Sequence, residues 1–118
     1  MNLKFTHKPN YFLFAELLIK HIEGYIHKHP ESKHATFDLR DIYQLFGQDY
    51  ASVTVNLAGI LNIADEYKVE TREGDRKIIQ HYQLNLEEHK LLVDFDQAAL
   101  AGLRQGNPPL APDASIQQ

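Results

Sequence analysis

Apolar residues recur every three or four positions between Pro9 and Pro30, and this spacing constrains the fold more than any other feature of the chain. A helix of 3.6 residues per turn places them on one face. They are Phe14, Leu17, Leu18, Ile22, Tyr25 and Ile26. Basic or ionisable side chains follow at residues 27–29, and Pro30 prevents the helix from continuing. We therefore predict an amphipathic helix over residues 11–26, followed by a polar loop over residues 31–36.

Two further helices are predicted on either side of Gly47. Asp38 is a suitable N-cap for a helix over residues 39–46, because its carboxylate can accept hydrogen bonds from free amides of the first turn. Gly47 suits the C-terminal position, which often needs a positive φ. Asp49 is the cap expected for the next helix, over residues 50–66. Two helices joined by a short turn that contains glycine form a helix-turn-helix.

The pattern changes after Tyr67. Long and β-branched side chains at residues 68–71 and 77–84 flank a turn, which predicts a two-stranded hairpin with its tip near Gly74. Asn85 is the expected cap of a last helix over residues 86–103. The remaining residues, 107–118, are expected to form a flexible tail. The predicted fold is therefore mainly α with a small β-hairpin, in a single domain over residues 1–106.

This order of elements resembles the winged helix-turn-helix family of small bacterial regulators. The resemblance covers about residues 10–104 and rests on residues 38–46 and 49–66 as the motif helices and on 64–77 as the wing. It implies that the second motif helix enters the DNA major groove while the wing contacts phosphates. The implied DNA contacts are Ser52, Thr54, Asn56, Arg72, Arg76 and Lys77. Many such regulators dimerise through the last helix. Its candidate homodimer contacts here are Leu91, Leu92, Phe95 and Leu103.

The distribution of charge favours a second interpretation. Twelve Lys and Arg stand against sixteen Asp and Glu, a net charge of −4, and residues 49–67 contain neither Lys nor Arg. Ala51, Val55 and Ala58 lie on a small, apolar side of the second motif helix, which suits packing against another protein. Two functions stay open. One is a non-catalytic protein that binds double-stranded DNA, such as a transcriptional regulator or a replication or partition accessory. The other is a protein-interaction module within a larger assembly.

Each of these signals also has a purely structural interpretation. Ser52, Thr54 and Asn56 are polar positions that any helix needs, and charges on a hairpin discourage edge pairing. The apolar side of the second motif helix can face another helix of the same chain. Residues 1–34 hold five lysines, three glutamates and five of the seven histidines. An anionic partner is therefore expected to approach residues 1–34, where protonation of the histidines adds positive charge at acidic pH.

Other classes of function find little support. The chain has no cysteine, and its scattered glycines form no phosphate-binding loop. His27 and His29 point to different sides of a helix, so we expect no metal site. None of the three serines lies in a nucleophile-elbow sequence, so we also expect no catalysis and no cofactor. The aromatic residues are spaced for core packing rather than for stacking on nucleic-acid bases. No apolar run approaches the length of about 18 residues of a membrane helix, and a cytoplasmic location is expected.

Overall fold

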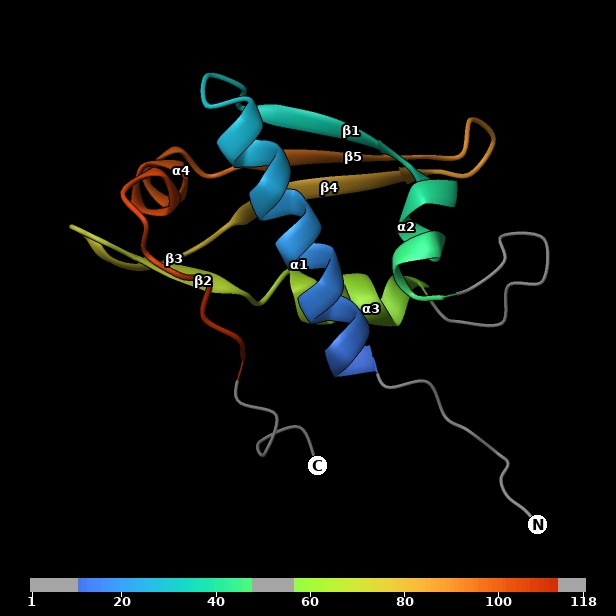
Figure 1. Cartoon of the computed structure of the whole chain (residues 1–118), viewed down its shortest axis with the longest axis horizontal. Helices are drawn as coiled ribbons and strands as arrows, with labels where there is room; N and C mark the ends of the chain where they lie inside the picture. The colour runs from blue at the N-terminus through green and yellow to red at the C-terminus, as the bar shows by residue number, and fades with distance from the viewer. Residues whose placement is uncertain (1–10, 48–56, 113–118) are drawn as a thin grey trace, which may run out of the picture.

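The computed structural model describes residues 11–47 and 57–112, and Figure 1 shows how their helices and strands are arranged. In chain order the elements are α1 (Tyr11–Lys28), β1 (His34–Asp38), α2 (Leu39–Leu45), α3 (Leu57–Ala64), β2 (Lys68–Thr71), β3 (Gly74–Lys77), β4 (Ile79–Asn85), β5 (Lys90–Phe95) and α4 (Gln97–Arg104).

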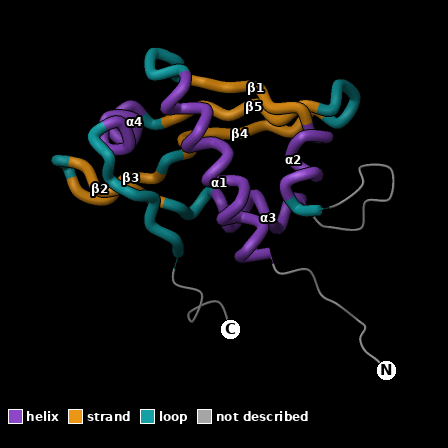
Figure 2. Tube along the Cα trace, viewed as in Figure 1, coloured by secondary structure: helices purple, strands orange, loops and turns teal. Residues whose placement is uncertain are grey.

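The strands form two antiparallel sheets within the described residues. The larger sheet has the order β1-β5-β4, and β2 and β3 form a separate hairpin. Strands β1 and β5 are far apart in the chain, and their register places Phe37 opposite Leu91 and Asp38 opposite Lys90. Figure 2 shows α1 crossing the three-stranded sheet, with α3 beside it and α4 near the β2–β3 hairpin. The architecture is α+β.

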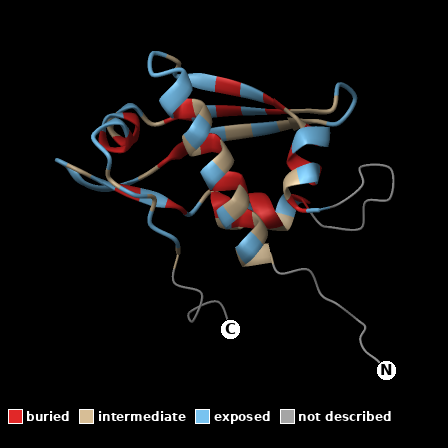
Figure 3. Cartoon of the chain, viewed as in Figure 1, coloured by how far each residue is buried: buried red, intermediate tan, exposed pale blue. Residues whose placement is uncertain are grey.

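The helix predicted over residues 11–26 is confirmed as α1, which extends to Lys28 and ends two residues before Pro30. One face of α1 supplies a large part of the core shown in Figure 3. Its buried side chains are Ala15, Leu18, Ile19, Ile22 and Ile26. They pack with buried residues of α3 and with the inner face of the sheet, from Ala35, Phe37, Leu91, Val93 and Phe95. Burial of this apolar surface is the main stabilising contribution to the fold.

The caps predicted around α2 are also confirmed. The Asp38 side chain accepts a hydrogen bond from the Arg40 amide at 2.8 Å, and α2 begins at the next residue. Gly47 has a φ of 70°, and its amide donates to the Gln44 carbonyl at 3.0 Å. Residues 48–56, where the helix over 50–66 was expected to begin, lie outside the described residues. The described part of that helix is α3.

The helix predicted over residues 86–103 is wrong. Residues 90–95 form β5, and only Gln97–Arg104 are helical in α4. Burial alternates along β5, with Leu91 inside and Leu92 outside. Leu91 and Phe95 are four residues apart, a spacing that fits one face of a helix and also fits one face of a strand. Asp96 then caps α4 by accepting a hydrogen bond from the Ala99 amide at 3.0 Å.

The predicted fold class is therefore wrong as well. A mainly α winged helix-turn-helix with one small hairpin does not fit this chain, because its described residues form five antiparallel strands in two sheets. The loop expected over residues 31–36 contains the start of β1, in which polar and apolar residues alternate over only five positions. The sequence from 77 to 84, expected as one strand, is divided between β3 and β4 at Ile78.

The segment after α4 is held against the hairpin. The amide of Leu110 donates to the Lys68 carbonyl at 2.7 Å, and the Lys68 amide donates back at 3.0 Å. Asn107 Nδ2 also donates to the Glu70 carbonyl at 3.0 Å. The tail predicted from residue 107 onward therefore does not begin there, because residues 107–112 are attached to β2. Residues 113–118 lie outside the described range.

Candidate binding surface

The hairpin cations predicted to contact phosphates differ in their surroundings. Arg76 Nη2 lies 2.8 Å from Asp96 Oδ1, and Lys77 Nζ lies 2.6 Å from Asp65 Oδ2. The hydrogen bonds to Asp96 and Asp65 raise the pKa of Arg76 and the pKa of Lys77 respectively. Arg72 is exposed at the turn and makes no ion pair with any described residue. Two of the three predicted phosphate contacts are thus neutralised by carboxylates of the chain itself.

The other predicted DNA contacts, Ser52, Thr54 and Asn56, lie outside the described residues, as do Ala51 and Val55 of the predicted protein-binding side. The remaining member of that side, Ala58, is exposed on α3. The opposite face of α3 is buried through Leu57, Ile60, Leu61 and Ala64, as its spacing predicts. The position of Ala58 is compatible with a partner surface, and the hypothesis for residues 51–55 stays a prediction.

The surface predicted for dimerisation does not exist as one face. Leu91, Phe95 and Leu103 are at most 2% exposed and belong to the core, whereas Leu92 is 40% exposed. Leu91 and Leu92 point to opposite sides of β5, because successive side chains of a strand alternate. These residues therefore cannot together contact a second copy. A homodimer stays a prediction without this surface.

A hollow of about 410 Å³ lies between the C-terminal half of α1 and the edge strand β1, and we name it the α1–β1 hollow. Its lining residues are Lys20, His21, Gly24, Tyr25, Lys28, His29 and Phe37. The Phe37 ring lies 5.4 Å from the Tyr25 ring and 5.5 Å from the His21 ring, and Tyr25 lies 4.4 Å from His29. These contacts give the hollow an aromatic lining with preformed geometry.

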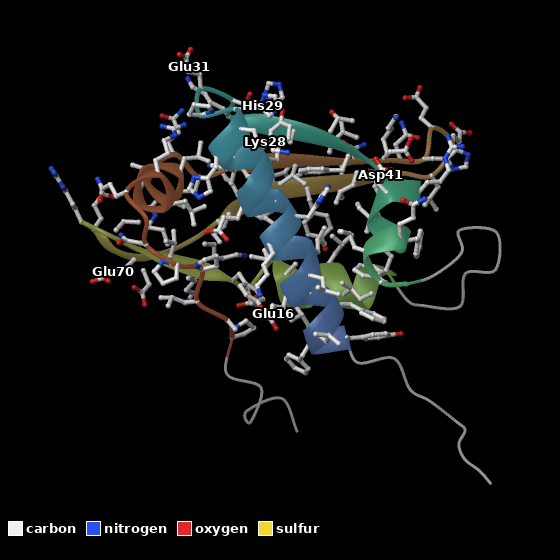
Figure 4. All side chains as sticks on the ribbon, viewed as in Figure 1. Glu16, Lys28, His29, Glu31, Asp41 and Glu70 are labelled. Atoms are coloured by element: carbon white, nitrogen blue, oxygen red, sulfur yellow. The ribbon has the colours of Figure 1, made fainter. Side chains whose placement is uncertain are left out.

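Cations surround this aromatic lining. Lys28 is exposed at the end of α1, beside β1, as Figure 4 shows, and it makes no ion pair within the described part of the chain. Lys20 lies 3.4 Å from Glu16, but both side chains are at least half exposed, so this pair is weak. Glu23 lies 3.7 Å from His27, and the two form an ion pair only when the His27 imidazole is protonated. The lining of the hollow itself contains Lys20 and Lys28 and no carboxylate, so it attracts negative charge more than it repels it.

Gly24 keeps the middle of the hollow open. It lies in the interior of α1 and is exposed, and a Cβ built on it would meet nothing within 4 Å. Glycine destabilises a helix interior by about 0.5–1 kcal/mol relative to alanine. No close approach of another segment requires glycine here. The absence of a side chain at Gly24 leaves this part of the lining of the hollow unobstructed.

The sequence indicated part of this surface. The excess of Lys and His in residues 1–34 predicted that an anionic partner would approach there. The hollow itself was missed, because Phe37 was not expected on a strand packed beside Tyr25. Apolar spacing indicates which residues are buried, but not which aromatic rings remain accessible at the border of the core.

The histidines form no metal centre among the residues that the structure places: no group of three or more His, Cys, Asp or Glu side chains converges there. None of the described helices combines the length and the apolar character needed to cross a membrane. No family model, curated protein or solved structure matches the chain.

Proposed function

We propose that this chain is a non-catalytic protein-interaction module, and that the α1–β1 hollow receives an acidic partner protein. The observation that carries this proposal is a lining of partly exposed aromatic rings, from His21, Tyr25 and His29, beside Lys28, which no described carboxylate neutralises. Such a surface suits a partner that brings both apolar and acidic side chains, because burial supplies affinity and charge supplies specificity. The cytoplasmic location expected from the sequence remains part of the proposal.

Two observations favour a protein over DNA as the partner. Affinity for DNA depends on cations that neutralise phosphates, and Arg76 and Lys77 already contact carboxylates of the chain. The net charge of −4 repels a polyanion such as DNA at long range. An acidic protein segment carries fewer charges and can place them locally against Lys28.

The experiment compares an acidic peptide with duplex DNA. The peptide probe is a fluorescein-labelled heptapeptide with glutamate at alternate positions and valine or tyrosine between them, and binding is followed by fluorescence anisotropy. Lys28→Glu should weaken peptide binding by about tenfold, because it replaces an attraction by a repulsion of similar size. Arg72→Glu is the matched control, because it reverses the charge of an exposed cation that does not line the α1–β1 hollow. It should change the affinity for the peptide by less than about twofold.

The opposite pattern would reject this function. If Arg72→Glu abolishes binding and Lys28→Glu does not, the hairpin rather than the α1–β1 hollow is the binding surface. If wild-type protein binds duplex DNA but not the peptide at about 0.15 M salt, the partner is a nucleic acid.

Binding of double-stranded DNA, in a transcriptional regulator or a replication or partition accessory, remains the second candidate. The exposure of Arg72 at the turn of the β2–β3 hairpin favours it, because this cation is available to a phosphate. Mobility shifts over a salt series test it, with the mass in solution measured alongside to test the homodimer. Arg72→Ala should then weaken binding to all sequences alike. Absence of duplex binding at micromolar protein and low salt would exclude this candidate.

A further inference from the structure

The backbone of β1 presents unused hydrogen-bonding groups along one edge. The Phe95 amide donates to the Lys33 carbonyl and the Leu39 amide to the His89 carbonyl, each at 2.9 Å. Residues of an antiparallel pair alternate between directing their backbone groups toward the partner strand and away from it. Because residues 33 and 39 are hydrogen-bonded to Phe95 and His89, at either end of β5, the register implies that the backbone groups of Ala35 and Phe37 are also directed toward β5. The backbone groups of His34 and Thr36 therefore point away from the sheet.

The two edges of the larger sheet differ in their protection. Strand β4 has a register irregularity between Ile79 and His81, and such a bulge disfavours further pairing. Strand β1 lies at the other edge, pairs with β5 without interruption, and contains no proline or lysine. In Figure 1 none of the described helices or strands runs along the outer side of β1. This edge therefore lacks the usual features that prevent an additional strand from pairing.

The α1–β1 hollow adjoins this same edge. Phe37 projects from the inner face of β1 and contacts the rings of His21 and Tyr25 on α1. Side chains of a strand added beside β1 would alternate in the same way as those of β1. Every second side chain of the added strand would lie on the same face of the sheet as Phe37, toward the hollow. The others would lie on the outer face, next to His34 and Thr36.

The charges around the edge determine which segment fits. Lys28, Lys33 and His34 are exposed near the start of β1, and Arg104 lies beside Lys33 and Glu31. The exposed acids in this region are Glu31 and Asp94, which is opposite His34 in the register. At the far end, Asp38 is already paired with Arg40 at 3.5 Å and with Lys90 at 3.6 Å. The start of β1 is therefore net positive, and the complementary segment carries acidic side chains there.

We propose that the partner binds by strand addition: an extended acidic segment of another protein pairs with the outer edge of β1 and inserts alternate side chains into the α1–β1 hollow. This rests on the proposed function and specifies its binding mode. Main-chain hydrogen bonds would provide affinity that does not depend on side chains, and the hollow and its cations would select the sequence.

Thr36 provides the sharpest test. Thr36→Pro removes the amide that points to the free edge, and proline is tolerated at such a position of an edge strand because no ladder hydrogen bond is lost. Thr36→Ala is the matched control, because it removes the same side chain and keeps the amide. With the acidic heptapeptide as probe, Thr36→Pro should weaken binding by about tenfold and Thr36→Ala by less than about twofold.

A second measurement leaves the protein unchanged and so does not depend on the folding of a variant. The same peptide is synthesised with N-methyl groups on alternate backbone amides, in the two possible phases. One phase blocks the donors that face β1 and should lose about tenfold in affinity, whereas the other should bind like the parent peptide. Hydrogen exchange at the Thr36 amide of the wild-type protein should slow when the parent peptide is added.

The outcomes separate the two proposals. Equal binding of both methylated peptides, with unchanged exchange at Thr36, would overturn strand addition; if Lys28→Glu still weakens binding, the proposed function stands. Absence of any binding of the parent peptide to wild-type protein at millimolar concentration would overturn both. Competition by duplex DNA that displaces the bound peptide at about 0.15 M salt would also overturn both and support a nucleic-acid partner.

Discussion

Gly102 of α4 lies directly against the backbone carbonyl of Glu70 in β2. A Cβ at position 102 would come within 2.6 Å of the Glu70 oxygen, and the methyl groups of Val69 and Thr71 lie 3.5 and 3.6 Å from the same point. The close approach of helix and strand therefore depends on the absence of a side chain at residue 102. It joins α4 to the hairpin, whose outer end carries Arg72.

Alanine at the two helical glycines should act in opposite directions. Gly102→Ala should destabilise the protein by about 1–3 kcal/mol, because α4 and β2 would have to separate. Gly24→Ala should stabilise it by about 0.5–1 kcal/mol, because its Cβ meets no atom and alanine favours the helix. Urea denaturation of both variants measures the two changes. A stabilising Gly102→Ala would show that α4 does not pack on β2 as closely as described.

Asp96 has two roles that different substitutions separate. Its carboxylate accepts from the Ala99 amide at 3.0 Å as the cap of α4 and lies 2.8 Å from Arg76 Nη2. Asp96→Asn keeps a capping oxygen and loses the ion pair with Arg76, which contributes little to stability because the arginine is exposed to solvent. Asp96→Ala loses both and should destabilise by about 1–2 kcal/mol more than Asp96→Asn. Thermal denaturation compares them, and equal losses would contradict the capping role.

Adjacent leucines of β5 should differ strongly in their contribution to stability. Leu91 is fully buried and Leu92 is 40% exposed, because they point to opposite faces of the sheet. Leu91→Ala should cost about 2–5 kcal/mol, as expected for a cavity in a packed core. Leu92→Ala should cost less than about 1 kcal/mol. Chemical denaturation measures both values. Similar losses at the two positions would contradict the alternation of β5.

Acid should weaken the start of α2 through Asp38. The hydrogen bond from the Arg40 amide lowers the pKa of Asp38, and the charges of Arg40 and Lys90 act in the same direction, against desolvation. A carboxyl group whose pKa is lower in the folded state stabilises the fold above its unfolded pKa, and this contribution is lost as pH falls through the folded value.

Asp38→Asn removes this titration and keeps an oxygen that can cap the helix. The melting temperature of the wild-type protein should therefore fall more steeply than that of Asp38→Asn between about pH 5 and pH 2. The two curves should be furthest apart at neutral pH and converge in acid. Parallel curves across this range would show that Asp38 contributes nothing to the acid sensitivity.

The number of cations near the candidate surface could be predicted from the sequence, but the ion pairs that neutralise other cations could not. The excess of cations near Lys28 could be counted directly, and it predicts that an anionic partner approaches the first third of the chain. The pairing of Arg76 with Asp96 and of Lys77 with Asp65 could not be predicted, because each pair joins positions that only folding brings together. A charge count treats every cation as available, whereas contacts within the chain decide which ones are.

Local interactions specify three features that the sequence predicts correctly: α1 through its apolar spacing, the start of α2 through the Asp38 cap, and the end of α2 through Gly47. Residues 34–38 and 90–95 acquire their strand conformation only on folding, because they pair as β1 and β5 across more than fifty residues. The four-residue spacing of Leu91 and Phe95 satisfies a helix and a strand equally well. Residues 90–95 form a strand because they hydrogen-bond to β1. The same pairing leaves the other edge of β1 free beside the α1–β1 hollow.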